Sequence, residues 1–193
     1  MIGCETIVAA AAFCALARNP ECLPVRHRYL WPALWAISKQ ESGGRTHALR
    51  DETLGREIRV RSEAEAIAYA KAHPTHKLGA GLMQITGDNL IAYFGRDWWR
   101  LAFKGCASLR AGADHFAKRD MPKAFASYNG TGDGARLHAA RVSAHLETVL
   151  AGMEQATPVQ PTLRPDLACG RPPPAWHGPS TARYRACLKG SSS

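Results

Sequence analysis

The stretch from residue 30 to residue 44 constrains this chain most, because it places an acid where a helix would normally present an apolar side chain. Residues at i, i+4, i+7 and i+11 share one helical face, and here they are Leu30, Leu34, Ile37 and Glu41. Gly43 and Gly44 are typical of the left-handed residues that end a helix, so we expect Glu41 in the last turn, turned inward near the negative end of the helix dipole.

Apolar surroundings and the helix dipole both favour the neutral form of Glu41 over its carboxylate. A protonated carboxylic acid is what general acid catalysis requires. The alternative interpretation is a solvent-exposed Glu41 that simply ends an amphipathic helix, which is the commoner place for a glutamate. Two later motifs favour the catalytic interpretation.

The length of the chain limits the number of domains, and its net charge limits the kind of partner that it can bind. The chain has 193 residues, enough for one domain with a genuine core. Its net charge of +9 indicates an anionic partner, which could be nucleic acid, a membrane surface or bacterial cell wall. The basic residues are scattered, without the Lys/Arg runs or aromatic ladder of a nucleic-acid-binding protein, so we expect no nucleic acid as partner.

The N-terminal segment is apolar and short. Residues 7–17 have the length of a signal-peptide core and end in Ala15-Leu16-Ala17, a small-x-small pattern that suits signal peptidase. The segment is too short to span a bilayer as a helix. We therefore predict that residues 1–21 form a signal peptide for export to the periplasm. No basic residue precedes the segment, whereas the acidic Glu5 does. Because a signal peptide normally begins with basic residues, a first core helix is the alternative.

The cysteine count fits an oxidising compartment. Cleavage after Ala17 would remove Cys4 and Cys14 and leave an even number, namely Cys22, Cys106, Cys169 and Cys187. These four allow three pairings, of which we favour Cys22–Cys106 with Cys169–Cys187. Neither Cys-x-x-Cys nor His-x-x-x-His spacing occurs, so we expect no metal site.

The remaining periodic segments are helical. Ser62 and Glu65 form a capping box that predicts a helix to about Ala72. A last helix is expected over about residues 135–153, with one apolar face made by Val142, Leu146, Val149 and Met153. No strand-length alternation is visible, and residues 45–61 read as an irregular connection. We predict a mainly α domain over residues 22–153, followed by a tail over residues 154–193 that holds seven of the twelve prolines.

Three motifs follow one another along this domain. The first is Glu41-Ser42, the second is the turn Gly81-Leu82-Met83-Gln84-Ile85, and the third is Ser127-Tyr128-Asn129-Gly130-Thr131-Gly132. Their order and spacing resemble the signature motifs of soluble lytic transglycosylases with a goose-type lysozyme fold. The small members associated with type IV secretion and conjugation machinery are the most similar, since they also carry a cysteine like Cys106. The resemblance covers residues 22 to 150 and not the proline-rich tail.

The resemblance implies cleavage of peptidoglycan between N-acetylmuramic acid and N-acetylglucosamine by a monomer without a cofactor. Glu41 would protonate the glycosidic oxygen and then deprotonate the C6 hydroxyl, which closes a 1,6-anhydro ring. Tyr128 would donate a hydrogen bond to Glu41, and Ser42 would help to position the acid. Gln84 and Asn129 would bind glycan, and Met83 would line the cleft. The activity would open the wall for a secretion or conjugation apparatus, or for an infecting phage.

The sequence departs from this family beside the acid. Many relatives have Asn-Pro where this chain has Arg45-Thr46, and larger members have a ligand-binding serine where Arg50 stands. The two arginines are candidates to contact the lactyl or peptide carboxylates of the substrate. The first alternative function is a hydrolytic lysozyme with a second carboxylate, for which the candidates are Asp51, Glu52 and Glu57, although we favour solvated loop positions for all three. The second is a non-catalytic wall-binding protein of the same fold.

Overall fold

The computed structural model describes residues 11–118 and 132–156. These residues are mainly helical, as predicted, and include a small sheet. The helices, in chain order, are α1 (Ala11–Arg18), the 3₁₀ helix η2 (Val25–Leu30), α2 (Trp31–Ser42), α3 (Glu63–Ala72), α4 (Asp88–Phe94), α5 (Trp99–Ala102), α6 (Gly105–Ala117) and α8 (Asp133–Ala156). The strands are β1 (Leu49–Asp51), β2 (Arg56–Ile58), β3 (Leu78–Ala80) and β4 (Ile85–Thr86).

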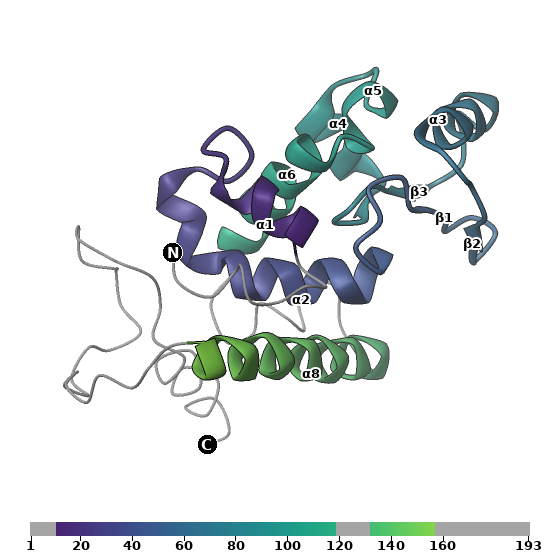
Figure 1. Cartoon of the computed structure of the whole chain (residues 1–193). Helices are drawn as coiled ribbons and strands as arrows, with labels where there is room; N and C mark the ends of the chain where they lie inside the picture. The colour runs from purple at the N-terminus through teal and green to yellow at the C-terminus, as the bar shows by residue number, and fades with distance from the viewer. Residues whose placement is uncertain (1–10, 119–131, 157–193) are drawn as a thin grey trace.

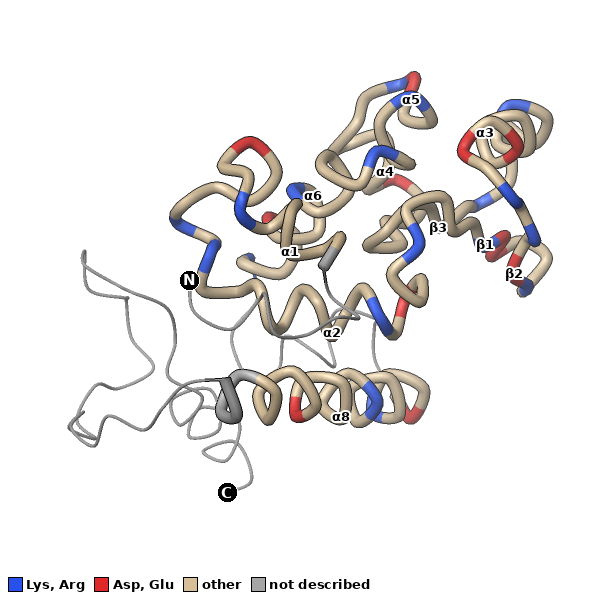
Figure 2. Tube along the Cα trace, in the orientation of Figure 1, with Lys and Arg blue, Asp and Glu red and all other residues tan. Residues whose placement is uncertain are grey.

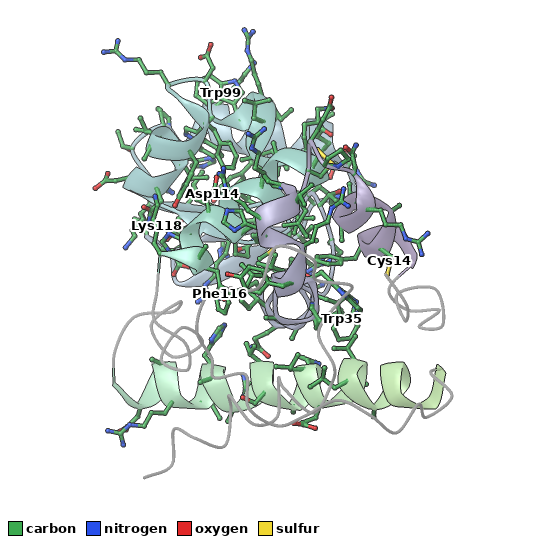
Figure 3. The ribbon with its side chains drawn as sticks, turned by 90° about the vertical axis from the view of Figure 1, so that its left-hand side faces the viewer. Cys14, Trp35, Trp99, Asp114, Phe116 and Lys118 are labelled. Atoms are coloured by element: carbon green, nitrogen blue, oxygen red, sulfur yellow. A yellow bond between two sulfur atoms is a disulfide. The ribbon has the colours of Figure 1, made fainter. Side chains whose placement is uncertain are left out.

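Helix α2 lies at the centre of the fold. Pro32 stands in its first turn, where a missing N–H costs nothing, and Gly43 ends it in the left-handed conformation at φ 65°. The predicted helix end is therefore confirmed. Its first eight residues are all buried, because η2 and α6 pack against it and the 24-residue α8 runs antiparallel along its other side (Figure 1). The side chain of Trp35 (labelled in Figure 3) meets the ring of His145 of α8 edge-on, with the ring centroids 6.4 Å apart.

The predicted apolar face of the last helix is confirmed by the burial of Val142, Leu146 and Val149. The side chain of Met153 lies outside the described residues. The predicted capping box is also present, because the hydroxyl of Ser62 accepts the backbone N–H of Glu65 at 3.2 Å and opens α3.

A four-stranded antiparallel sheet lies beyond the C-terminal end of α2, in the order β2-β1-β3-β4. Leu49 pairs with Ile58 on one side and with Ala80 on the other. The expectation of an irregular connection over residues 45–61 is therefore wrong. Strands of two or three residues are too short to show the alternation of buried and exposed positions that marks a strand in a sequence.

Two features tie the N-terminal part to the rest. A disulfide joins Cys22 to Cys106 at the start of α6, as expected. Helix α1 packs against α6 and buries Phe13, Cys14 and Ala17, and Cys14 is also disulfide-bonded. Residues 11–18 thus have the packing of a first core helix. Within the described residues, no helix has both the length and the apolar character needed to cross a membrane.

Candidate functional site

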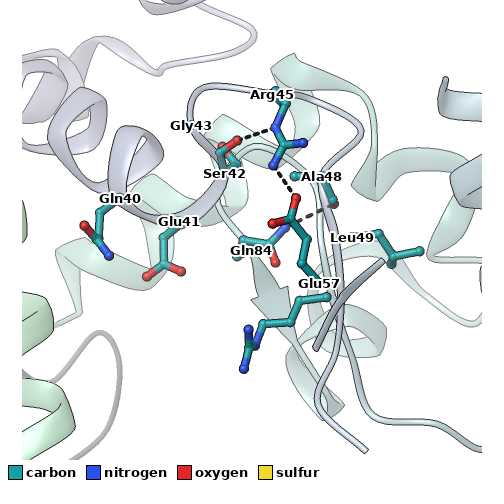
Figure 4. Close-up of a pocket in the computed structure, with 10 residues that line it drawn as sticks. Gln40, Glu41, Ser42, Gly43, Arg45, Ala48, Leu49, Glu57 and Gln84 are labelled. Carbon is teal, nitrogen blue, oxygen red and sulfur yellow. Dashed lines mark hydrogen bonds and ion pairs between the residues drawn. The ribbon is translucent and has the colours of Figure 1, made fainter. Parts of the chain in front are cut away.

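Glu41 lies in the last turn of α2, at the edge of a cavity of about 260 Å³. Its side chain is 16% exposed, so it is largely inward, as the helical face predicted. The cavity lies between the end of α2 and the sheet (Figure 4). It is lined by Gln40, Glu41, Ser42, Gly43, Arg45, Ala48, Leu49, Arg50, Glu57 and Gln84. Glu41 and Gln84, which are 43 positions apart in the chain, therefore share one cavity.

His138 of α8 is the partner of Glu41. Its Nε2 lies 2.6 Å from Oε1 of Glu41, and its side chain is only 6% exposed. Sequence reasoning did not name this residue. A signal was present, because His138 stands four positions before Val142 on the apolar face of the last helix. A titratable side chain on a buried face usually has a specific partner.

Ser42 joins the end of α2 to the second motif. Its hydroxyl lies 2.8 Å from both the carbonyl of Ser38, one turn earlier, and the carbonyl of Leu82. The Ser42 oxygen also accepts the backbone N–H of Gly44 at 3.1 Å. With three backbone partners and a buried side chain, Ser42 fixes the position of the turn that carries Glu41.

Gln84 stands in the wall of the cavity in an unusual conformation. Its φ of 45° makes it the one non-glycine residue at positive φ among the described residues. Its amide nitrogen donates to the carbonyls of Ala48 at 3.1 Å and of Gly81 at 3.0 Å. Both N–H bonds of the side chain are used in this way. The carbonyl oxygen of Gln84 makes no hydrogen bond within the described residues, so this side chain can offer a ligand an acceptor.

Met83, which was expected to line the cleft, is not among the residues that line the cavity. Its side chain is fully buried against Gly112 of α6, where a Cβ would come within 2.6 Å of the Met83 Cγ. Its backbone N–H donates to the hydroxyl of Ser108 on α6 at 3.1 Å. Met83 therefore packs the second motif against α6.

The two arginines of the cavity are both ion-paired. Arg45 pairs with Glu57 and also donates to the carbonyl of Ser42 at 3.0 Å. Arg50 pairs with Glu52 at 3.1 Å and donates to the carbonyl of Gly55. Their side chains are about half exposed, and the guanidinium groups stand at the rim of the cavity with their charge largely balanced by neighbouring carboxylates.

Asp51 is not the solvated loop residue that the sequence suggested, because its side chain is fully buried in β1. Burial alone would raise the pKa of its carboxyl. Hydrogen bonds from His76 at 2.6 Å, from the Tyr69 hydroxyl at 2.8 Å and from the Leu54 backbone at 3.0 Å outweigh burial and lower this pKa to about 2. The Asp51 carboxylate is thus ionised near neutral pH and connects β1 to α3 and to the residues that follow α3.

Tyr128 and Asn129 of the third motif lie outside the described residues, as do Cys169, Cys187 and the proline-rich tail. Across residues 11–118 and 132–156, no three His, Cys, Asp or Glu side chains are grouped as ligands for a metal ion. Comparison of the chain with protein-family models, curated proteins and solved structures found no match.

Proposed function

We propose that this chain is a peptidoglycan lytic transglycosylase with a lysozyme-like catalytic domain, in which Glu41 is the only catalytic carboxylate. One observation carries the proposal: Glu41 is a largely buried acid at a cavity whose other lining carboxylate within the described residues, Glu57, is neutralised by an ion pair. Asp51 is fully buried in β1 with three hydrogen-bond donors and does not line the cavity, and Glu57 is ion-paired with Arg45. A hydrolase with two carboxylates needs a second one placed to activate water or to attack the sugar.

In the proposed reaction, Glu41 gives its proton to the glycosidic oxygen as the C1–O bond breaks. The bonding electrons pass to the leaving oxygen, and C1 acquires oxocarbenium character. The Glu41 carboxylate then removes the proton of the C6 hydroxyl on the same muramic acid residue, and that oxygen bonds to C1. The acid is restored to its protonated form, so one residue completes both steps without an incoming water.

The surroundings of Glu41 fit a glycan substrate. The carbonyl oxygen of Gln84 can accept a hydrogen bond from a sugar hydroxyl or from the N–H of an N-acetyl group. Arg45 and Arg50 at the rim can exchange their present acidic partners for substrate carboxylates. The proposed roles of Tyr128 and Asn129, orienting the acid and binding glycan, come from the resemblance of the third motif alone.

The proposed setting is the bacterial envelope. Charged residues of both signs are spread over the described trace (Figure 2), and the net charge of +9 suits an anionic wall polymer. The Cys22–Cys106 disulfide favours an oxidising compartment such as the periplasm. Local opening of the wall for a secretion or conjugation apparatus, or for a phage, is the role that the resemblance suggests.

A matched pair of variants tests the proposal. Glu41→Gln keeps the size of the side chain and removes its acid, so lysis of purified peptidoglycan should fall at least 100-fold. Glu57→Gln changes another acid of the same cavity and should leave lysis within about threefold, since exposed ion pairs contribute little. Full lysis by the Glu41→Gln variant would refute the proposal.

One observation supports a second candidate, a hydrolytic lysozyme. Glu57 lines the same cavity as Glu41, and its side chain is 53% exposed, so water can reach it. If Glu57 activates that water, Glu57→Gln should abolish lysis as completely as Glu41→Gln does. Release of reducing sugar ends would accompany that result.

A further inference from the structure

The hydrogen bond between His138 and Glu41 contains one proton, and the atom that carries this proton decides whether Glu41 can protonate a substrate. At 2.6 Å, Nε2 of the imidazole and Oε1 of the carboxyl are too close for two lone pairs to face one another. One proton therefore lies between them. It belongs either to the acid, which would then donate to the imidazole, or to the imidazole, which would then donate to the acid.

The two arrangements differ in what they leave for the substrate. If the acid donates to His138, its proton is held toward α8 and is not available to a glycosidic oxygen. If the imidazole donates to Oε1, Oε2 is left free to carry the proton of the acid and to give it to the substrate. That second oxygen makes no hydrogen bond within the described residues and belongs to a side chain that lines the cavity.

We infer that His138 is a positioning residue for Glu41: a neutral imidazole that carries its proton on Nε2, donates it to Oε1 and reserves Oε2 for the reaction. The inference rests on the proposed function of Glu41. An imidazolium in this place would favour the ionised carboxylate and remove the acid before the first step. A neutral donor can hold Oε1 both before and after the proton leaves Oε2.

The arrangement suits a reaction in which the same acid acts twice. In the first step Oε2 releases its proton to the glycosidic oxygen, and in the second it receives the proton of the C6 hydroxyl. His138 keeps its own proton in both steps, so its hydrogen bond fixes the rotation of the carboxyl group while the charge on that group changes. Preorganisation of this kind reduces the reorganisation needed during reaction.

The packing of α8 on α2 explains how the contact is held. His138 lies on the face of α8 that also buries Val142, Leu146 and Val149 against the rest of the core. With 6% of its side chain exposed, the imidazole is held between the two helices. Glu41 is thereby connected to an element 97 positions away in the chain.

Two variants at His138 test the role. His138→Phe keeps a ring but removes the donor, and we expect kcat for peptidoglycan lysis to fall 10- to 100-fold with KM within about twofold. His138→Gln supplies an amide N–H near the position of Nε2 and should recover kcat to within about fivefold of the wild-type protein. His145→Gln, on the same helix but against Trp35, is the matched control and should retain full kcat.

The wild-type protein gives a test that needs no substitution. Long-range ¹H–¹⁵N correlation spectra of histidine-labelled protein should show His138 neutral and protonated on Nε2 at the pH of maximal lysis. An unprotonated Nε2 or an imidazolium would overturn the inference, as would full kcat in the His138→Phe variant. If that variant is fully active while Glu41→Gln is inactive, only this inference fails. If Glu41→Gln is fully active, the proposed function fails as well.

Discussion

Replacing Gly81 with alanine should damage both the stability of the domain and its cavity. Gly81 has a φ of 80°, which costs an ordinary residue about 1–2 kcal/mol. A Cβ at this position would also lie 2.0 Å from the backbone carbonyl oxygen of Ala102, which cannot move without shifting α5. With about 1–3 kcal/mol added for overpacking, we estimate the total loss in the free energy of unfolding at about 2–5 kcal/mol.

Gly55 provides a matched control for this substitution. Its φ of 66° is similar, but a Cβ there meets nothing within 4 Å, so Gly55→Ala should cost only the conformational part, about 1–2 kcal/mol. Urea denaturation followed by circular dichroism measures both variants. Because Gly81 accepts a hydrogen bond from Gln84, its alanine variant should also lose lysis under conditions where it is still folded. Equal destabilisation by the two substitutions would refute the reasoning.

Three further predictions follow from individual contacts. Removal of the Cys22–Cys106 disulfide, which spans 84 positions, should lower the free energy of unfolding by about 4 kcal/mol, measured by urea denaturation of the double serine variant. Because folding lowers the pKa of Asp51 from 3.8 to about 2, its carboxylate stabilises the fold above pH 3.8 and loses that effect as the pH falls toward 2. Thermal melts should show a weaker pH dependence in this range for Asp51→Asn. Finally, Gln84→Glu would set a carboxylate against two backbone carbonyls and should cost about 2–3 kcal/mol, whereas equal stability would contradict the assigned amide orientation.

The helical part of the fold could be predicted because its signals are local. The glycine pair that ends α2, the capping box of Ser62 and Glu65, and the apolar face of α8 each depend on residues a few positions apart. The same local pattern placed Glu41 in the last turn of its helix. Of the two disulfides in the pairing that we favour, the structure contains Cys22–Cys106, and Cys169–Cys187 lies outside the described residues.

The remaining features depend on distant parts of the chain. Residues 49–51 and 78–80 form strands β1 and β3 because they pair with each other. No local pattern in the sequence indicates this pairing. Asp51 can be buried because Tyr69 of α3 and His76, in the loop after α3, supply hydrogen bonds to its carboxylate. His138 was missed for the same reason, because its partner is fixed by the packing of α8 on α2 and not by its sequence neighbours.

The chemical form of the sugar ends released from purified peptidoglycan tests the central claim most directly. If Glu41 alone carries both proton transfers, mass spectrometry of the digest should find 1,6-anhydromuramic acid ends, 18 Da lighter than reducing ends by the loss of one water, and the Glu41→Gln variant should release neither. Reducing muramic acid ends from the wild-type protein would contradict the account, because water would then have taken the place of the C6 hydroxyl.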